Sequence, residues 1–415
     1  MSCGLVRSGF AAFLFGGMLT IVCPVAVADR INLAALTELE DAKQAGRIVK
    51  EYKGETLEFP QVGRLSPAAA EVLAKHDTDI ELNAVRKLDA DLAAAWSGFK
   101  HTLLLHGVTH LDDQTSAALA AGSATLSLEN LESLTHVQLA AKLAKQANFL
   151  RFRRLTKIEK PVADALSQGI CGLALPMIET LDHAGIATKL LNDGTFPCIF
   201  ERLAVLEPAA GKALCVVPCD LYFKSLTKMP PAVAKALEGH RGVLDVDQLE
   251  GLDPAACASL LTNNGPLDLG GCDTLVVPGQ PVPPAVLEAF SGHQGSLTLG
   301  GLANIPLDLA DAIRQRQHHT TLTDVAFVTA VLAGGLAGKG GPNGVVWLPH
   351  ATGIEQGQNN AAQALLMIKP RPGPVGALGP AAIILPGELK DKLPEALTVA
   401  IEKHACLHFN NQFGP

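Results

Sequence analysis

The sequence has few aromatic residues, an excess of negative charge and, beyond its first residues, no long apolar run. Only two Trp and two Tyr occur among 415 residues, so the aromatic platforms on which sugars or single-stranded nucleic acids stack are scarce. The formal net charge of −8 argues against a nucleic-acid partner, because phosphate recognition requires a basic face. After residue 28, no stretch reaches the roughly 18 apolar residues of a membrane-spanning helix. We therefore expect a protein that does not bind nucleic acid and does not span a membrane once its N-terminal segment is removed.

Local motifs of common enzymes and metal sites are also missing. The sequence contains no His-Glu-x-x-His, no Gly-x-Ser-x-Gly and no dinucleotide-binding glycine pattern. The glycine-rich stretch at 334–344 lacks the order of residues that forms a phosphate-binding loop. We expect no catalytic residue, no cofactor and no metal site. An enzyme whose site is assembled from distant segments is the remaining alternative.

The N-terminus has the pattern of a secretory signal peptide. Arg7 precedes an apolar segment at 10–25, and Ala26-Val27-Ala28 forms a small-residue cleavage site. A membrane anchor is the weaker interpretation, because the apolar segment is short. We expect residues 1–28 to be removed and the mature protein to be secreted, periplasmic or part of the cell envelope. Its net charge changes from −8 to −9, since Arg7 is the only charged residue in this segment.

The sequence does contain a repeat with a period of about 23 residues. Apolar residues occupy positions 1, 3, 6 and 9 of each copy, and fourteen copies fill residues 29–354. A fixed period in this range is typical of a solenoid. A degenerate repeat and a C-terminal cap are expected at 355–415. Position 1 falls at residues 31, 57, 80, 103, 126, 150, 173, 198, 221, 244, 267, 297, 320 and 346.

Each copy predicts one short strand followed by one short helix. Positions 1 and 3 alternate with polar residues, as in Leu244-Asp245-Val246, which indicates a strand with one buried face. The helix follows, with a small residue 13 places after position 1 and a large apolar residue 16 places after it, as in Ala70 and Leu73. Because one copy cannot bury its apolar face alone, stacked copies share a continuous core. The predicted fold class is α/β: a solenoid with parallel strands on one face and helices on the other.

The pattern Leu-x-Leu-x-x-Leu-x-x-Leu followed by a short helix resembles the leucine-rich repeat, in a 23-residue variety of secreted bacterial proteins. Position 6 departs from that family, whose repeats usually place there an Asn or Cys that bonds neighbouring turns. In this chain the position is apolar, as in Leu131 and Leu249, and only Cys272 matches. The resemblance implies a scaffold that binds a protein or another ligand, without implying which one.

The cysteines cannot all pair in disulfides within the chain. Nine occur in the chain and two of them lie within residues 1–28, which leaves an odd number of seven. Cys215 and Cys219 flank a turn between two coils, and their pairing in an oxidising compartment stays open. Three others occupy repeat positions, where we interpret them as small buried side chains: Cys198, Cys257 and Cys272.

Candidate binding residues lie between positions 1 and 3 of each repeat, where we expect the side chain to point off the exposed strand face, and at positions 4 and 5, which flank this column. This column is uneven, with a basic spot that Arg202 and Lys224 extend, an acidic spot some coils away, and two aromatic residues. Its aspartates supply too few oxygen ligands for calcium. The candidate binding residues are Arg151, Arg153 and Arg154 in the basic spot, Asp245, Asp247 and Asp268 in the acidic spot, and the aromatic residues Tyr222 and Trp347.

Three functions compete at this stage. The first is a secreted or periplasmic scaffold that binds a protein or glycan through its strand face. The second is a structural component of the cell envelope that assembles with itself. The third is the enzyme with a site built from distant segments. The oligomeric state is not predicted.

Overall fold

A computed structural model describes residues 33–146, 149–190, 197–216, 219–277, 279–337, 343–355, 361–366, 368, 383–403 and 407–410. The expected signal peptide at 1–28 and the first repeat position at residue 31 lie outside these residues.

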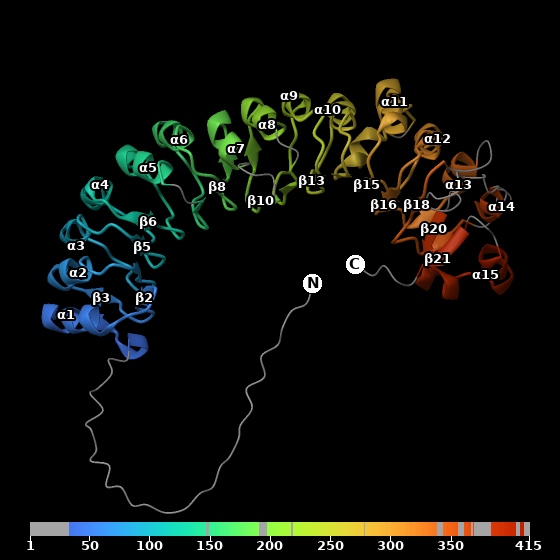
Figure 1. The fold of residues 1–415 in the computed structure, drawn as a ribbon. Helices are drawn as coiled ribbons and strands as arrows, with labels where there is room; N and C mark the ends of the chain where they lie inside the picture. The colour runs from blue at the N-terminus through green and yellow to red at the C-terminus, as the bar shows by residue number, and fades with distance from the viewer. Residues whose placement is uncertain are drawn as a thin grey trace, which may run out of the picture.

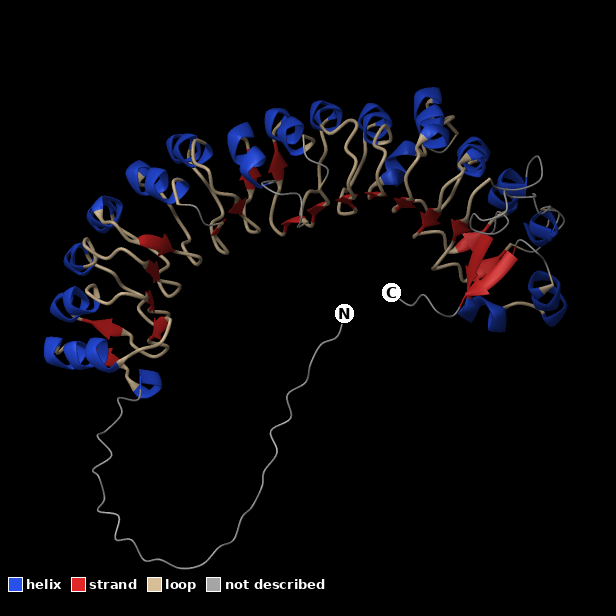
Figure 2. Cartoon of the chain, in the orientation of Figure 1, coloured by secondary structure: helices blue, strands red, loops and turns tan. Residues whose placement is uncertain are grey.

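The described chain forms a curved solenoid (Figure 1). Strands line the inner, concave edge of the arc, and helices cover the outer, convex edge (Figure 2). Each helix packs mainly on the helix of the next coil, and each strand on the strand of the next coil. The predicted fold class is therefore confirmed, and the curvature places the strand face on the concave side.

Every position-1 residue from Leu57 to Val346 lies in a short parallel strand. Pairing joins equivalent positions of successive coils, such as Leu244 with Leu267. The strands form three sheets, ordered β2-β4-β5-β6, β7-β8 and β10-β12-β13-β14-β15-β16-β18-β20-β21. Their bounds are β2 Thr56–Glu58, β4 Asp79–Glu81, β5 Thr102–Leu104, β6 Thr125–Ser127, β7 Leu150–Arg151, β8 Leu173–Ala174, β10 Cys198–Phe200, β12 Leu221–Phe223, β13 Leu244–Val246, β14 Leu267–Leu269, β15 Leu297–Leu299, β16 Thr320–Leu322, β18 Val346–Trp347, β20 Ile383–Pro386 and β21 Leu407–Asn410.

Some coils add a second short strand just before the helix, which the sequence pattern did not predict. These strands pair as β1-β3, β9-β11 and β17-β19. They straighten the turn that leads into the helix and give its backbone a hydrogen-bonding partner in the next coil. Their bounds are β1 Glu38–Leu39, β3 Arg64–Leu65, β9 Thr180–Leu181, β11 Val205–Leu206, β17 Phe327–Val328 and β19 Gly353–Ile354.

Several helices begin at residues whose side chains cap free backbone amides, and others begin at a Glu or Pro without such a bond. Ser66, Asp89 and Asp112 each accept a hydrogen bond from a backbone N–H in the first turn. No described helix has the length and hydrophobicity of a membrane span. The bounds are α1 Ala42–Glu51, α2 Pro67–Leu73, α3 Ala90–Ala95, α4 Asp113–Ala121, α5 Val137–Ala144, α6 Lys160–Ser167, α7 Ala184–Leu190, α8 Pro208–Leu214, α9 Pro231–Ala236, α10 Pro254–Leu260, α11 Pro284–Gly292, α12 Leu307–Gln315, α13 Ala330–Ala337, α14 Ala361–Leu366 and α15 Glu395–Glu402, with 3-10 helices η1 Leu33–Ala35, η2 Cys272–Leu275 and η4 Gly387–Lys392.

One continuous core runs the length of the solenoid. The small and large helix residues 13 and 16 places after position 1 are buried, as are the apolar side chains at position 6 from Val62 to Val325. Because position 6 is apolar, the polar side chains that bond neighbouring turns lie elsewhere, at the turn after the helix. They form a buried column in successive coils that consists of His240, Asn263, His293 and Arg316.

Candidate functional site

Neighbouring strands of the nine-stranded sheet bring one column of the candidate residues into register on the concave face. Tyr222 pairs with Asp245, and Asp245 pairs with Asp268. Thr298 and Thr321 continue the column to Trp347. Strands in a sheet lie roughly 4.8 Å apart, so successive side chains in this column are neighbours.

Arginines of the expected basic spot are largely neutralised. The guanidinium of Arg153 lies 2.7 Å from Glu129, and that of Arg154 lies 3.2 Å from Glu132. Arg202 is likewise paired with Glu179 at 2.7 Å. The prediction of a basic patch is wrong, because stacking places a glutamate of the preceding coil beside each of these arginines.

Arg151 differs from its neighbours, since the ion pairs among the described residues do not include it. It lines a small pocket of about 190 Å³ between β6 and β7, beside Ser127 and the exposed Phe149. This pocket lies where the four-stranded sheet ends. It is several coils away from the aspartates, so the structure does not bring Arg151 to the acidic group.

Lys224 joins the acidic group and not the basic spot. Its ammonium forms an ion pair with Asp245 and lies 5.4 Å from the centre of the Tyr222 ring. Asp245, expected to be exposed, is only 7% exposed. It is covered because it lies between Tyr222 and Asp268 in the sheet and under the Lys224 side chain. Thr321, in the same column, is also 7% exposed, so the expected exposure of this column is wrong at both places.

Asp268 and Asp247 carry carboxyl groups that resist ionisation. Burial, followed by the charges of Asp245 and Asp247, raises the pKa of Asp268 to about 7. Burial likewise raises the pKa of Asp247, and the charge of Asp245 adds to this effect. A carboxyl group with a pKa near 7 changes its charge within the physiological range.

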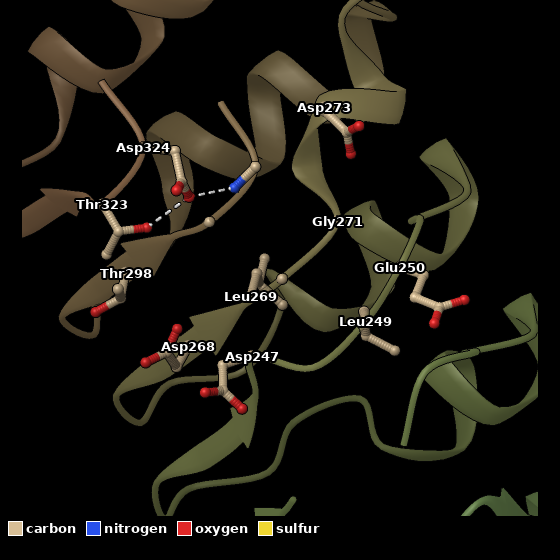
Figure 3. A pocket seen from close by; sticks show the side chains of 13 residues that line it. Asp247, Leu249, Glu250, Asp268, Leu269, Gly271, Asp273, Thr298, Thr323 and Asp324 are labelled. Carbon is tan, nitrogen blue, oxygen red and sulfur yellow. Dashed lines mark hydrogen bonds between the residues drawn. The ribbon is translucent and has the colours of Figure 1, made fainter. Parts of the chain in front are cut away.

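Beside these aspartates the concave face opens into a pocket of about 440 Å³ (Figure 3). Residues from four successive coils line it, and none of them, all in the described part of the chain, is basic. Its carboxylates are Asp247, Glu250, Asp268, Asp273 and Asp324.

Two glycine pairs shape this pocket. Gly270-Gly271 follows β14, and Gly300-Gly301 follows β15. A Cβ on Gly270 would lie 2.1 Å from the carbonyl oxygen of Asp247, so a larger residue would push the turns apart. Gly271 and Gly301 have φ angles of 63° and 84°, which favour glycine. The missing side chains leave the space that the surrounding carboxylates face.

Asp324 supports the rim of the pocket. Its carboxylate accepts hydrogen bonds from the backbone N–H of Gly301 at 2.6 Å and from the hydroxyl of Thr323 at 3.0 Å. Sequence reasoning missed Asp324, Asp273 and Glu250, because they lie outside the column beside position 1. The signal that could have found the pocket is Leu-x-Leu-Gly-Gly, which occurs at 267–271 and at 297–301.

Of the candidate binding residues, the structure brings Tyr222, Asp245, Asp247 and Asp268 together. Trp347 lies on β18 and packs against His319, with ring centres 6.4 Å apart. Neither it nor the three arginines lines the acidic pocket. Within the described ranges, no three His, Cys, Asp or Glu side chains are arranged to hold a metal ion.

The class that this geometry defines is a leucine-rich-repeat-like solenoid with an apolar position 6. In sequence, no family model matches the chain, and no curated protein matches it. Among solved structures it is similar to an internalin from Listeria monocytogenes, with 13% identity over 79% of this chain and 93% of that one, at a TM-score of 0.42. It is also similar to a leucine-rich-repeat protein of Leptospira interrogans, with 13% identity over 81% of this chain and 95% of that one, at a TM-score of 0.34.

Proposed function

We propose that this protein is a secreted or periplasmic scaffold of the 23-residue bacterial variety that binds a protein partner through its concave face. The observation that carries this proposal is the acidic pocket, whose lining includes five carboxylates and no basic side chain. The chemistry fits a Lys or Arg side chain of the partner. A guanidinium donates in a fixed fork that matches carboxylates such as those of Asp247 and Asp268.

Charge on the pocket supports a protein partner over a glycan. Sugars are commonly held by aromatic faces, and neither Tyr222 nor Trp347 lines the pocket. No basic side chain lines the pocket, and the nearby Lys224 is already paired with Asp245. A cationic side chain of the partner would therefore supply the positive charge that balances the carboxylates. Self-assembly in the envelope is the competing proposal, and sedimentation over a range of concentrations separates the two.

The pKa of Asp268 gives the interaction a defined pH dependence. A bound cation favours the ionised carboxylate, whereas Asp268 is about half protonated in the free protein near pH 7. Affinity should therefore rise with pH, by about tenfold between pH 6 and pH 8 if this one group controls binding. It should level off above pH 8.

The experiment is capture of partners from native envelope extract with the immobilised protein. The double variant Asp247→Asn, Asp268→Asn keeps side-chain size and removes charge. The matched control, Glu71→Gln with Glu238→Gln, removes the same charge from exposed residues on α2 and after α9. A partner retained by the wild type and the control but bound at least tenfold more weakly by the double variant supports the proposal.

The captured partner, once purified, allows titration at several pH values and salt concentrations. Binding driven by ion pairs should weaken as salt rises. Equal retention by all three proteins, or an affinity that does not change between pH 6 and pH 8, contradicts the acidic pocket as the binding site.

A further inference from the structure

Three cysteines outside the candidate site lie together where the nine-stranded sheet begins. Cys198 is the first residue of β10, and Cys215 is the residue that follows α8. Cys198 pairs with Leu221 of β12, and Cys219 lies two residues before Leu221 in the chain. The backbone N–H of Cys198 donates to the carbonyl oxygen of Asp220 at 2.8 Å. Stacking of successive coils therefore brings Cys198 next to Cys219.

Contacts of the sulfur atoms select one pair among the three. The thiols of Cys198 and Cys219 are hydrogen-bonded to each other. Cys198 also lies 3.4 Å from the carbonyl oxygen of Leu190. Burial, followed by the charge of Cys219, raises the pKa of Cys215 to about 11.

Accessibility differs within the pair. Cys219 is buried, whereas Cys198, which the repeat pattern predicts to be buried, is only partly covered. The strand of the preceding coil, β8, does not pair with β10, so Cys198 lies at an edge of the sheet. Cys198 is therefore the more accessible of the two residues.

We propose that Cys198 and Cys219 are a modification site, at which a disulfide-bearing oxidant cross-links two successive coils. The pairing considered from the sequence, Cys215 with Cys219, is replaced by one between coils. The inference is independent of the acidic pocket and of the proposed function.

The chemistry is two thiol–disulfide exchanges. The hydrogen bond with Cys219 and burial raise the pKa of Cys198, so the first exchange should speed up as the pH rises. In that exchange the Cys198 thiolate attacks one sulfur of the oxidant, which forms a mixed disulfide and releases the first thiol of the oxidant. Cys219 lies beside this mixed disulfide and, after losing its own proton, attacks the Cys198 sulfur as a thiolate. Cys219 then displaces the second thiol from Cys198. In total the two cysteine thiols are oxidised to one disulfide, and the oxidant is reduced to two thiols that take up both protons.

The cross-link would fasten the free edge of the nine-stranded sheet. β10 is its first strand and has a sheet neighbour on one side only, β12. A disulfide that closes a loop of about 20 residues restricts the unfolded chain and stabilises the folded one. The expected result is a melting temperature that falls by a few degrees on reduction.

The test uses the purified full chain, treated with oxidised glutathione, alkylated and digested with trypsin. Cleavage after Lys189, Arg202, Lys212 and Lys224 gives the peptides 190–202 with Cys198 and 213–224 with both other cysteines. The proposal predicts that mass spectrometry finds these two peptides joined. A disulfide inside peptide 213–224, or alkylation of Cys198 and Cys219 after the treatment, overturns it.

Serine variants assign the sulfur atoms. In Cys215→Ser the joined peptides should persist, and the melting temperature should still fall on reduction. In Cys198→Ser and Cys219→Ser both the joined peptides and this fall should be lost. Joined peptides that disappear in Cys215→Ser assign the bond to Cys215 and overturn the proposal.

Discussion

Gly271 shows how a single residue shapes the concave face. It follows β14 in the left-handed region of backbone conformation, with φ at 63°. A Cβ at this place would lie 2.5 Å from the backbone nitrogen of Gly251 in the preceding coil. The residue thus satisfies two demands, one of local backbone geometry and one of close stacking. Gly239 has a similar φ of 75° but open space around it. A substitution at Gly239 therefore tests the backbone conformation alone, whereas one at Gly271 tests the conformation and the close stacking together.

Gly271→Ala is therefore expected to lower the free energy of unfolding more than Gly239→Ala does. The backbone conformation alone should cost about 1 kcal/mol in both variants. The clash with the preceding coil should at least double that loss for Gly271→Ala. Urea unfolding followed by circular dichroism measures both. Equal losses in the two variants would show that the neighbouring turn moves aside freely.

Among the structural elements, β6 and β7 show how the solenoid continues across a break in its sheet. These strands do not pair. The side-chain amide of Gln146 takes the place of a strand: it donates to the carbonyl oxygen of Leu126 at 2.9 Å and accepts from its backbone N–H at 2.8 Å. Buried backbone groups must be satisfied, so the break persists because one side chain fills it.

Replacing Gln146 with Ala should lower the free energy of unfolding by roughly 1–3 kcal/mol, since it leaves two backbone groups of β6 without a partner. Gln114→Ala on the exposed side of α4 serves as the control and should change stability by less than about 0.5 kcal/mol. Hydrogen exchange at Leu126 gives a local readout and should accelerate only in the Gln146 variant. Unchanged exchange there would contradict the role of the side-chain amide.

At the scale of the whole molecule, the buried column of His240, Asn263, His293 and Arg316 links coils that are distant in sequence. The Asn263 carbonyl oxygen accepts from the backbone N–H of His240 at 2.8 Å. Arg316 donates to backbone carbonyls of the preceding coil, including that of Gly295 at 2.7 Å. The column thus performs the task that an Asn or Cys ladder at position 6 performs in leucine-rich repeats.

Acid should weaken this column. Burial lowers the pKa of His240 and His293 in the folded protein, whereas the unfolded chain has a His pKa of about 6.5. Because the unfolded state takes up the proton more readily than the folded state, these histidines do not reduce the free energy of unfolding above pH 6.5. They reduce it increasingly as the pH falls below that value. The next coil already has an asparagine, Asn263, at the equivalent place. We therefore expect the variant His240→Asn to lose less stability between pH 7 and pH 5 than the wild type.

The measurement is the free energy of unfolding at several pH values, with the exposed His350→Asn as control. Asp268 has the opposite effect, since its raised pKa favours the folded state as the pH falls, but it is present in all three proteins and cancels in the comparison. An identical pH dependence in the wild type and His240→Asn would contradict the assignment.

The periodic pattern predicted most of the fold because the information is local to each repeat. The alternation at Leu244-Asp245-Val246 and the pair Ala70 and Leu73 needed only the spacing of apolar residues, and the structure buries these apolar residues where expected. Candidate binding residues were less predictable. The column between positions 1 and 3 gave Asp268, and the flanking position 4 gave Asp247. Arg153 and Arg154 were misjudged, because their glutamate partners lie one coil, or more than 20 residues, away.

The sequence by itself determined the repeat length, the positions of the first strand and the helix of each copy, and the apolar side chains that are buried, since these follow from the residues within one copy. Only the tertiary structure decided which charges meet. One sheet ends at β6 and another starts at β10, and stacking sets Lys224 beside Asp245. The acidic pocket is likewise a product of the tertiary structure. It exists because two glycine pairs, 30 residues apart in the chain, lie in adjacent coils and leave room for carboxylates from their neighbours.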